Sequence, residues 1–233
     1  ETHLSADAEV PVMRIRDFGD DPDVAVVAGV HGDEPCGPRG VDAFLADPPT
    51  FRRPVRFVVA NERALERGVR YVDEDLNRAF PGDADADSHE RRLAADLLST
   101  VENCTTLALH STQSYAGPFA LVDTVDPEKA TLCTRLPIDT VVETAAYAGG
   151  RLIDYPGTVE VECGLQWSDG AAENARLVID AFLAAAGVLK NIECTATDKA
   201  GREHALLVNV REVSIRDGTL LYSCRDITKR KQR

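Results

Sequence analysis

The chain contains short runs of β-branched and small apolar residues that end abruptly in glycine or in a polar residue. The clearest run covers residues 24–29, Val-Ala-Val-Val-Ala-Gly, and leads within two residues to His31. Such a run predicts a strand that is buried on both faces, as strands of parallel sheets are. Parallel strands need a crossover connection, commonly a helix, so this feature favours an α/β architecture.

Strand and helix patterns alternate along most of the chain. Strands are predicted over 10–15, 24–29, 55–60, 105–109, 118–122, 140–143 and 157–162. Helices are predicted over 37–46, over 90–99 after a Ser88 cap, and over 174–186. This order predicts a three-layer α/β/α fold with a mixed, largely parallel sheet. We expect residues 1–187 to form this domain.

Composition narrows the class of protein. With 233 residues, 44% of them hydrophobic, the chain can bury one good core. It has no run of about 18 apolar residues, so we predict no membrane span. The net charge of −13 argues against nucleic acid as a partner. Five lysines stand against 39 acidic residues, a balance typical of proteins from high-salt cytoplasm; we predict a halophilic source, and an ordinary acidic protein is the alternative.

The six cysteines are scattered, and no two of them form a Cys-x-x-Cys pair. This spacing argues against a zinc ribbon or finger. In a domain with a sizeable core, such cysteines are typical of buried thiols in a reducing compartment. We therefore predict a cytoplasmic location.

Polar residues with metal-binding side chains stand where predicted strands end. His31 and Glu34 follow the strand over 24–29, and His110 closes the strand over 105–109. Open α/β sheets place their sites at such strand ends. Two histidines and one carboxylate suit a catalytic zinc, which keeps one position open for water. The alternatives are a polar turn at His31 and a hydrogen-bonded, non-ligating His110.

A hydrolase also needs a group that carries a proton. Glu162 is the best candidate, because it stands at the end of the strand over 157–162. Glu160 lies two residues earlier on the same face and is the rival candidate. The alternative is that both are solvated strand carboxylates.

Residues 70–82 form a dense polar segment that stops at Phe-Pro-Gly. Arg70, Asn77 and Arg78 do not share one helical stripe, which predicts a loop. Two guanidinium groups and an amide suit an anionic substrate, one Arg binding a carboxylate and the other a developing oxyanion. A salt-bridged surface loop is the alternative.

Four motifs together resemble the succinylglutamate desuccinylase/aspartoacylase family, a branch of the zinc carboxypeptidase-like hydrolases. They are His31-Gly32-Asp33-Glu34-Pro35, Asp75-Leu76-Asn77-Arg78-Ala79-Phe80-Pro81-Gly82, Leu109-His110-Ser111-Thr112 and Glu162-Cys163-Gly164-Leu165-Gln166, and the likeness covers about residues 10–187.

The resemblance implies roles for particular residues within and near these motifs. One zinc ion (Zn²⁺) per chain would be held by His31, Glu34 and His110, with Glu162 as general acid/base. Arg70 would polarise the scissile carbonyl. The substrate carboxylates would be bound by Asn77, Arg78 and a Tyr147-x-x-x-Arg151 element. In one departure, Ala108 stands two residues before His110, where family members often have an acidic residue.

The expected activity is zinc-dependent hydrolysis of the amide bond of a small N-acyl amino acid. Two alternatives remain: a carboxypeptidase-like metallopeptidase, and a non-catalytic sensor or interaction module with a vestigial zinc site. A homo-oligomer is compatible with the sequence.

The C-terminal segment, residues 188–233, departs from the family, which continues with a β-rich domain. Alternating runs over 205–213 and 219–224 flank Arg216-Asp217-Gly218, a strong hairpin signal. The closing residues 225–231 resemble the end of a PAS sensor domain. The alternative is a β-hairpin that packs on the hydrolase and replaces the family's second domain.

Overall fold

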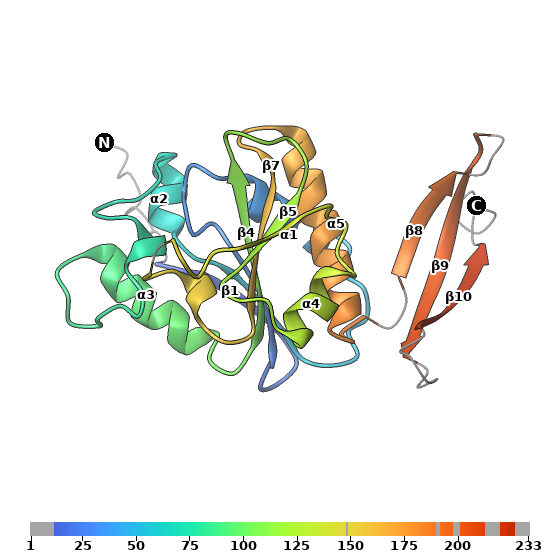
Figure 1. The fold of residues 1–233 in the computed structure, drawn as a ribbon, viewed down its shortest axis with the longest axis horizontal. Helices are drawn as coiled ribbons and strands as arrows, with labels where there is room; N and C mark the ends of the chain where they lie inside the picture. Colours follow the sequence, from blue (N-terminus) through green and yellow to red (C-terminus); the bar gives the residue numbers. More distant parts are fainter. Residues whose placement is uncertain (1–11, 148, 190–191, 198–200, 213–219, 227–233) are drawn as a thin grey trace, which may run out of the picture.

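The computed structural model describes residues 12–147, 149–189, 192–197, 201–212 and 220–226. Its main body is built on one seven-stranded sheet (Figure 1). The strands are β1 (Arg14–Phe18), β2 (Val24–Ala28), β3 (Val55–Val59), β4 (Thr105–Thr112), β5 (Phe119–Val122), β6 (Val141–Glu143) and β7 (Thr158–Leu165). Their spatial order is β1-β3-β2-β4-β7-β5-β6.

The sheet is mixed but mostly parallel. Strands β3, β2, β4 and β7 form a parallel centre, and β6 pairs parallel with β5. Strands β1 and β5 run antiparallel to β3 and β7, respectively. Because β2, β4 and β7 are parallel neighbours, their carboxyl ends meet at one edge of the sheet.

Helices cover both faces of this sheet. They are α1 (Cys36–Leu45), α2 (Glu62–Arg67), α3 (His89–Thr100), α4 (Pro127–Cys133) and α5 (Asp169–Ala185), with short 3-10 turns η1 (Leu76–Arg78) and η2 (Leu152–Asp154). Apolar side chains of α1 and α5 pack on one face, and those of α3 pack on the other. The predicted three-layer α/β/α fold is confirmed.

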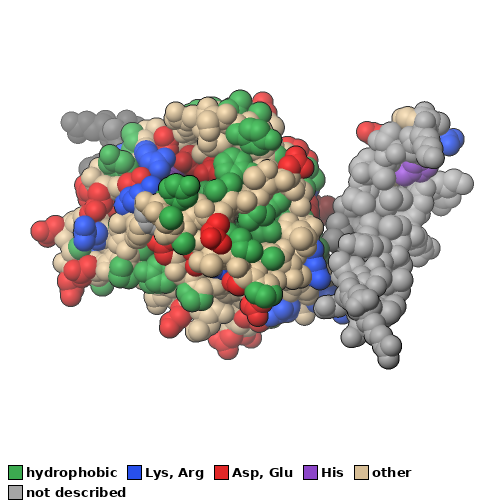
Figure 2. All heavy atoms as spheres, in the orientation of Figure 1, with side chains coloured by type: hydrophobic (Ala, Val, Ile, Leu, Met, Phe, Trp, Pro, Cys, Tyr) green, Lys and Arg blue, Asp and Glu red, His purple; other side chains and the backbone are tan. Residues whose placement is uncertain are grey.

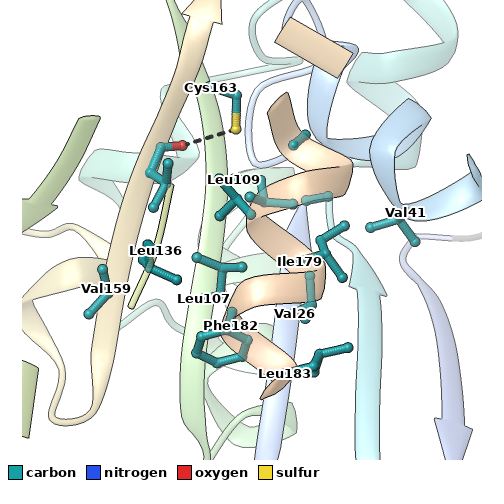
Figure 3. Close-up of a cluster of buried hydrophobic side chains, with 14 of the residues drawn as sticks. Val26, Val41, Leu107, Leu109, Leu136, Val159, Cys163, Ile179, Phe182 and Leu183 are labelled. Atoms are coloured by element: carbon teal, nitrogen blue, oxygen red, sulfur yellow. Dashed lines mark hydrogen bonds between the residues drawn. The ribbon is translucent and has the colours of Figure 1, made fainter. Parts of the chain in front are cut away.

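The larger of two apolar cores lies between α5, α1 and the centre of the sheet (Figure 3). Phe182, Ile179 and Leu107 contribute side chains that are fully buried. The two helices approach closely at Gly40, where an added Cβ would lie 2.7 Å from the Cβ of Ala175. Dense packing of this kind gives the strand ends a rigid support.

Several element bounds differ from the predictions. Helix α5 begins at Asp169 rather than at 174, because the Ser168 side chain accepts a hydrogen bond from the Ala171 backbone and caps the helix. Strand β1 begins at Arg14 rather than at 10, and an ion pair between Asp17 and Arg56 joins it to β3. Helices α2 and α4 were not predicted.

The C-terminal segment forms a second sheet that shares no described strand with the first and is drawn apart from it in Figure 1. It consists of β8 (Ile192–Thr197), β9 (Glu203–Glu212) and β10 (Leu220–Asp226), all antiparallel. The two predicted hairpin strands are present, whereas β8 was not predicted. The predicted turn over 216–218 lies outside the described residues, and the PAS resemblance stays a prediction.

The cysteines of the main body are buried, and the visible surface carries many acidic side chains, as the composition leads us to expect. Cys36, Cys104, Cys133 and Cys163 are buried free thiols, as predicted. Asp and Glu side chains are spread over the visible face of the main body (Figure 2). Among the described residues, no helix has the length and apolar character needed to cross a membrane.

Candidate metal and hydrolase site

The candidate site lies at the carboxyl edge of the three central strands. His31 follows β2 after a tight turn, His110 is near the end of β4, and Glu162 is near the end of β7. His110 and Glu162 are direct register partners across the β4–β7 pair. The turn depends on Gly32, since a Cβ there would lie 2.1 Å from the backbone carbon of Ala64.

His31, Glu34 and His110 form one compact, buried group. Their ligand atoms lie within 4.8 Å of one another, and each residue is at most 5% exposed. The Nδ1 atoms of His31 and His110 face the two Glu34 carboxylate oxygens, at 2.9 and 3.2 Å. The backbone N–H of Ser111 also donates to Glu34. Two imidazole nitrogens and one carboxylate thus converge on a single point.

Asp75 orients the first of these histidines. Its Oδ1 lies 3.0 Å from His31 Nε2, on the opposite side of the ring from Glu34. The same carboxylate caps η1 by accepting from the backbone N–H of Asn77. A carboxylate on the outer ring nitrogen is the usual companion of a metal-ligating histidine, because it fixes the ring and its tautomer. We assigned Asp75 no role from the sequence.

The charged groups of this cluster shift one another's pKa values. Burial raises the pKa of Glu34, but hydrogen bonds from His110 and His31 outweigh burial and hold that pKa well below its usual range. Burial lowers the pKa of His110, but Glu160 and Glu34 outweigh burial and raise it to about 10. His110 therefore holds a proton where a cation would fit, and metal binding would release it. This donor set suits zinc.

Glu162 stands beside the cluster with its own carboxylate incompletely paired. Its Oε2 atom is buried and has no hydrogen-bond partner among the described residues. Burial, together with Glu160 and Glu34, raises the pKa of Glu162 to about 7, although His110 opposes the shift. A carboxyl group with such a pKa is suited to take up and release a proton near neutral pH.

Arg70 reaches the cluster from the loop before η1. It donates from Nη1 to Glu34 at 3.2 Å and from Nε to Asp75 at 3.1 Å, while its side chain stays 42% exposed. Its backbone carbonyl accepts from the N–H of Gly32, which joins this loop to the His31 turn. The guanidinium is therefore close to the cluster and open to solvent.

A second residue without a role in our sequence-based predictions, Glu90, anchors this loop. It is fully buried at the start of α3. Its carboxylate accepts from the backbone N–H groups of Val72, Asp73 and Glu74, at 2.6 to 3.2 Å, and from the Asn61 amide. These partners lie 16 to 29 residues from Glu90 in the chain, so the contacts leave no local sequence pattern.

The remaining predicted binding residues lie in different settings. Asn77 is buried, and its Oδ1 accepts from the backbone N–H of Leu152. Arg78 is exposed. Arg151 is buried and donates to Asp154 and to the carbonyl of Thr144, so its hydrogen bonds are not made with the metal-binding cluster. The Tyr147 side chain is 79% exposed. Their substrate contacts stay predictions.

A sequence profile of the succinylglutamate desuccinylase/aspartoacylase catalytic domain matches residues 20–148, more than half of the chain. The chain belongs to this family. The matched region contains His31, Glu34 and His110, whereas Glu162 lies beyond its end. Family membership and the observed fold therefore agree with the resemblance of the four motifs.

Curated relatives support the same family. Over 83 residues, the chain is 37% identical to an N-acyl-aromatic-L-amino acid amidohydrolase from Xenopus laevis, and the match covers 32% of the chain and 27% of the relative. Over 126 residues it is 30% identical to a probable aspartoacylase from Nostoc, covering 48% and 43%, respectively. The matched part is thus less than half the length of either relative.

A solved structure shares the fold. The product-bound ectoine utilization protein of Ruegeria pomeroyi superposes with a TM-score of 0.65 at 21% identity, covering 76% of the chain and 61% of that protein. At this identity the likeness concerns the fold of the family alone.

Proposed function

We propose that this protein is a zinc-dependent hydrolase of the amide bond in small N-acyl amino acids. One observation carries the proposal: two histidine Nδ1 atoms and a carboxylate converge on one point, next to a buried carboxylate with a raised pKa. Family membership supports hydrolysis of this type, and named relatives include N-acyl amino acid amidohydrolases. We assign the activity to residues 1–187, with 188–233 as a separate β-rich segment.

His31, Glu34 and His110 would hold one zinc ion per chain. When bound, zinc would polarise the scissile carbonyl and lower the pKa of the attacking water. Asp75 keeps the His31 ring oriented for this role through its contact with Nε2. The burial of all three ligands excludes bulk water from one side of the site, which strengthens electrostatic effects there.

Glu162 serves as the proton carrier. It accepts a proton from the attacking water as the new carbon–oxygen bond forms, and donates it to the amine nitrogen as the carbon–nitrogen bond breaks. The products are a carboxylate and a free amino acid. Arg70, beside the cluster and open to solvent, stabilises the negative charge that develops on the carbonyl oxygen.

Arginine side chains near the metal-binding residues would select the substrate. Arg78 is exposed and adjacent in the chain to the buried Asn77, so we assign to it the carboxylate of the amino acid. Arg151 and Tyr147 are the proposed contacts for a second carboxylate. A bidentate guanidinium–carboxylate pair would give this choice its geometry.

The test is a deacylation screen with purified full-length protein, with zinc added and with zinc chelated. N-acetylaspartate, N-succinylglutamate and an N-acetylated aromatic amino acid are compared with a blocked dipeptide, at low and high salt. Zinc-dependent release of a free amino acid from an N-acyl substrate supports the proposal. Faster cleavage of the dipeptide would favour a peptidase, and a protein that takes up no zinc would favour a non-catalytic module.

A further inference from the structure

Glu160 is a buried acid in the middle of a strand, where a carboxylate is costly unless it is paired. It is 4% exposed, and its neighbours Val159 and Val161 on β7 are fully buried. Its register partner on β4 is Ala108, a residue with only a methyl group. Burial of an ionised group in such a place needs a compensating partner. The partner must therefore come from the surrounding side chains.

The ring of His110 is a basic group close to Glu160. Glu160 Oε2 lies 3.7 Å from His110 Nε2, which is the ring nitrogen opposite the Nδ1 that faces Glu34. This Nε2 atom is buried and has no hydrogen-bond partner among the described residues. Glu160 and Glu34 thus stand at the two nitrogens of one imidazole.

A third residue holds Glu160 in this position. The Asn77 amide donates to the same Oε2 atom at 3.4 Å, while its carbonyl oxygen accepts from the backbone of Leu152. An amide N–H directed at Oε2 gives this buried oxygen a hydrogen-bond donor. The Asn77 side chain therefore links Glu160 to the segment that follows η1.

A similar arrangement is present at the other histidine, where the carboxylate is closer: Asp75 lies 3.0 Å from His31 Nε2, against 3.7 Å between Glu160 and His110 Nε2. His31 presents Nδ1 to Glu34 and Nε2 to Asp75, and His110 presents Nδ1 to Glu34 and Nε2 to Glu160. We infer that Glu160 is the positioning carboxylate of His110, supplied by the neighbouring strand β7. The 3.7 Å separation is longer than a hydrogen bond, and a small approach of the two groups would let Glu160 accept the Nε2–H of His110 and leave Nδ1 free to bind a metal ion. This inference rests on the proposed metal site.

The inference also separates two acids that are adjacent on one face of β7. Glu162 has an unpartnered oxygen, lies two residues nearer the carboxyl end of β7, and is less buried than Glu160. Glu160 lies deeper, and its described contacts are with His110 and Asn77. Glu160 thus acts through His110, whereas Glu162 acts on the reacting atoms.

The test measures zinc affinity by competition with a chromophoric chelator, together with the cobalt(II) absorption spectrum. Glu160→Ala should weaken zinc binding by about 10- to 100-fold, the usual effect of losing such a partner. Glu160→Gln keeps the shape and an acceptor oxygen, and should lose less. The thermal midpoint of each metal-free variant reports any damage to the fold separately.

A relocated carboxylate provides the sharpest control. Because Ala108 and Glu160 are register partners, the double variant Ala108→Asp with Glu160→Ala returns an acid to the same face and should recover part of the lost affinity. Parental zinc affinity in both Glu160→Ala and Glu160→Gln would overturn the inference alone. A parent protein that binds no zinc would overturn the proposed function together with it.

Discussion

His31 and Asp75 are 44 residues apart in the chain, yet His31 Nε2 and Asp75 Oδ1 lie 3.0 Å apart. The contact joins the turn after β2 to the start of η1. It also fixes which ring nitrogen of His31 faces Glu34, because Nε2 is already engaged. The loop of residues 70–78 therefore determines the geometry of the metal site as well as its charge.

Loss of the Asp75 carboxylate should weaken metal binding more than it weakens the fold. Asp75→Asn removes the negative charge beside His31 Nε2. We expect zinc affinity to fall by about 10-fold or more. Glu74→Gln is the matched control, since Glu74 is adjacent in the chain but pairs with Arg91 at the surface. Chelator competition on both variants measures the effect. Equal affinities would contradict the assigned role.

Zinc should stabilise the folded protein, because the three ligands converge only when it is folded. A ligand at about 1,000 times its Kd adds about 4 kcal/mol to the free energy of unfolding. For a chain of this size each kcal/mol corresponds to about 2–4 °C in Tm. Calorimetry with and without zinc tests the shift, and His110→Ala should abolish it. An unchanged Tm in the parent would argue against a metal site.

Glu162→Gln should remove turnover while zinc stays bound. Loss of a general acid/base commonly costs about 10²- to 10⁴-fold in rate. Steady-state kinetics and metal analysis of the same preparation test both parts. Near-parental turnover with zinc present would show that another group carries the proton.

The same carboxyl group predicts a pH dependence. As a base, Glu162 must be ionised to accept a proton, so kcat/KM should fall as the pH drops through its pKa. That pKa is about 7 without a metal ion. A bound dication nearby lowers it, so the acid limb should lie at or below that value. The limb should be absent from any residual activity of Glu162→Gln, and a limb that persists there belongs to another group.

Most of the fold could be predicted because its central strands are buried on both faces. The runs at Val24–Ala28 and Val55–Val59 have only apolar side chains apart from Arg56, and their burial matches this pattern. Strand β1 begins later than predicted, and four of its five residues are exposed; it is joined to β3 by the Asp17–Arg56 ion pair and by the packing of Phe18 on Phe57, so it carries little apolar alternation. Local patterns predict burial well and cross-strand ion pairs poorly.

The site residues also fall into those that the sequence predicts and those that it does not. His31, Glu34, His110 and Glu162 stand at strand ends, so the topology rule for parallel sheets brings them together. Asp75 and Glu160 owe their roles to side-chain contacts with the two histidines across loops and strands. Residue type and spacing do not specify such contacts, which depend on the packed structure.

Glu90 offers a test of how far the site depends on its supporting loop. Its buried carboxylate accepts hydrogen bonds from the three backbone N–H groups of residues 72–74 and from the side-chain amide of Asn61. Glu90→Ala removes the acceptor of all four hydrogen bonds, and a hydrogen bond to a charged group contributes about 1.5–3 kcal/mol, less where the donor is partly exposed as in residues 72–74. We expect the free energy of unfolding to fall by about 3 kcal/mol or more, as measured by urea denaturation.

Glu90→Gln should be milder, because it keeps one acceptor oxygen. Both variants should also lower zinc affinity, since the displaced loop contains Asp75 and Arg70, which contact His31 and Glu34. Glu102→Ala is a control on a residue at the surface beyond the end of α3, where we expect little change in either quantity. A destabilised Glu90→Ala that binds zinc as tightly as the parent would show that the metal site does not depend on the loop.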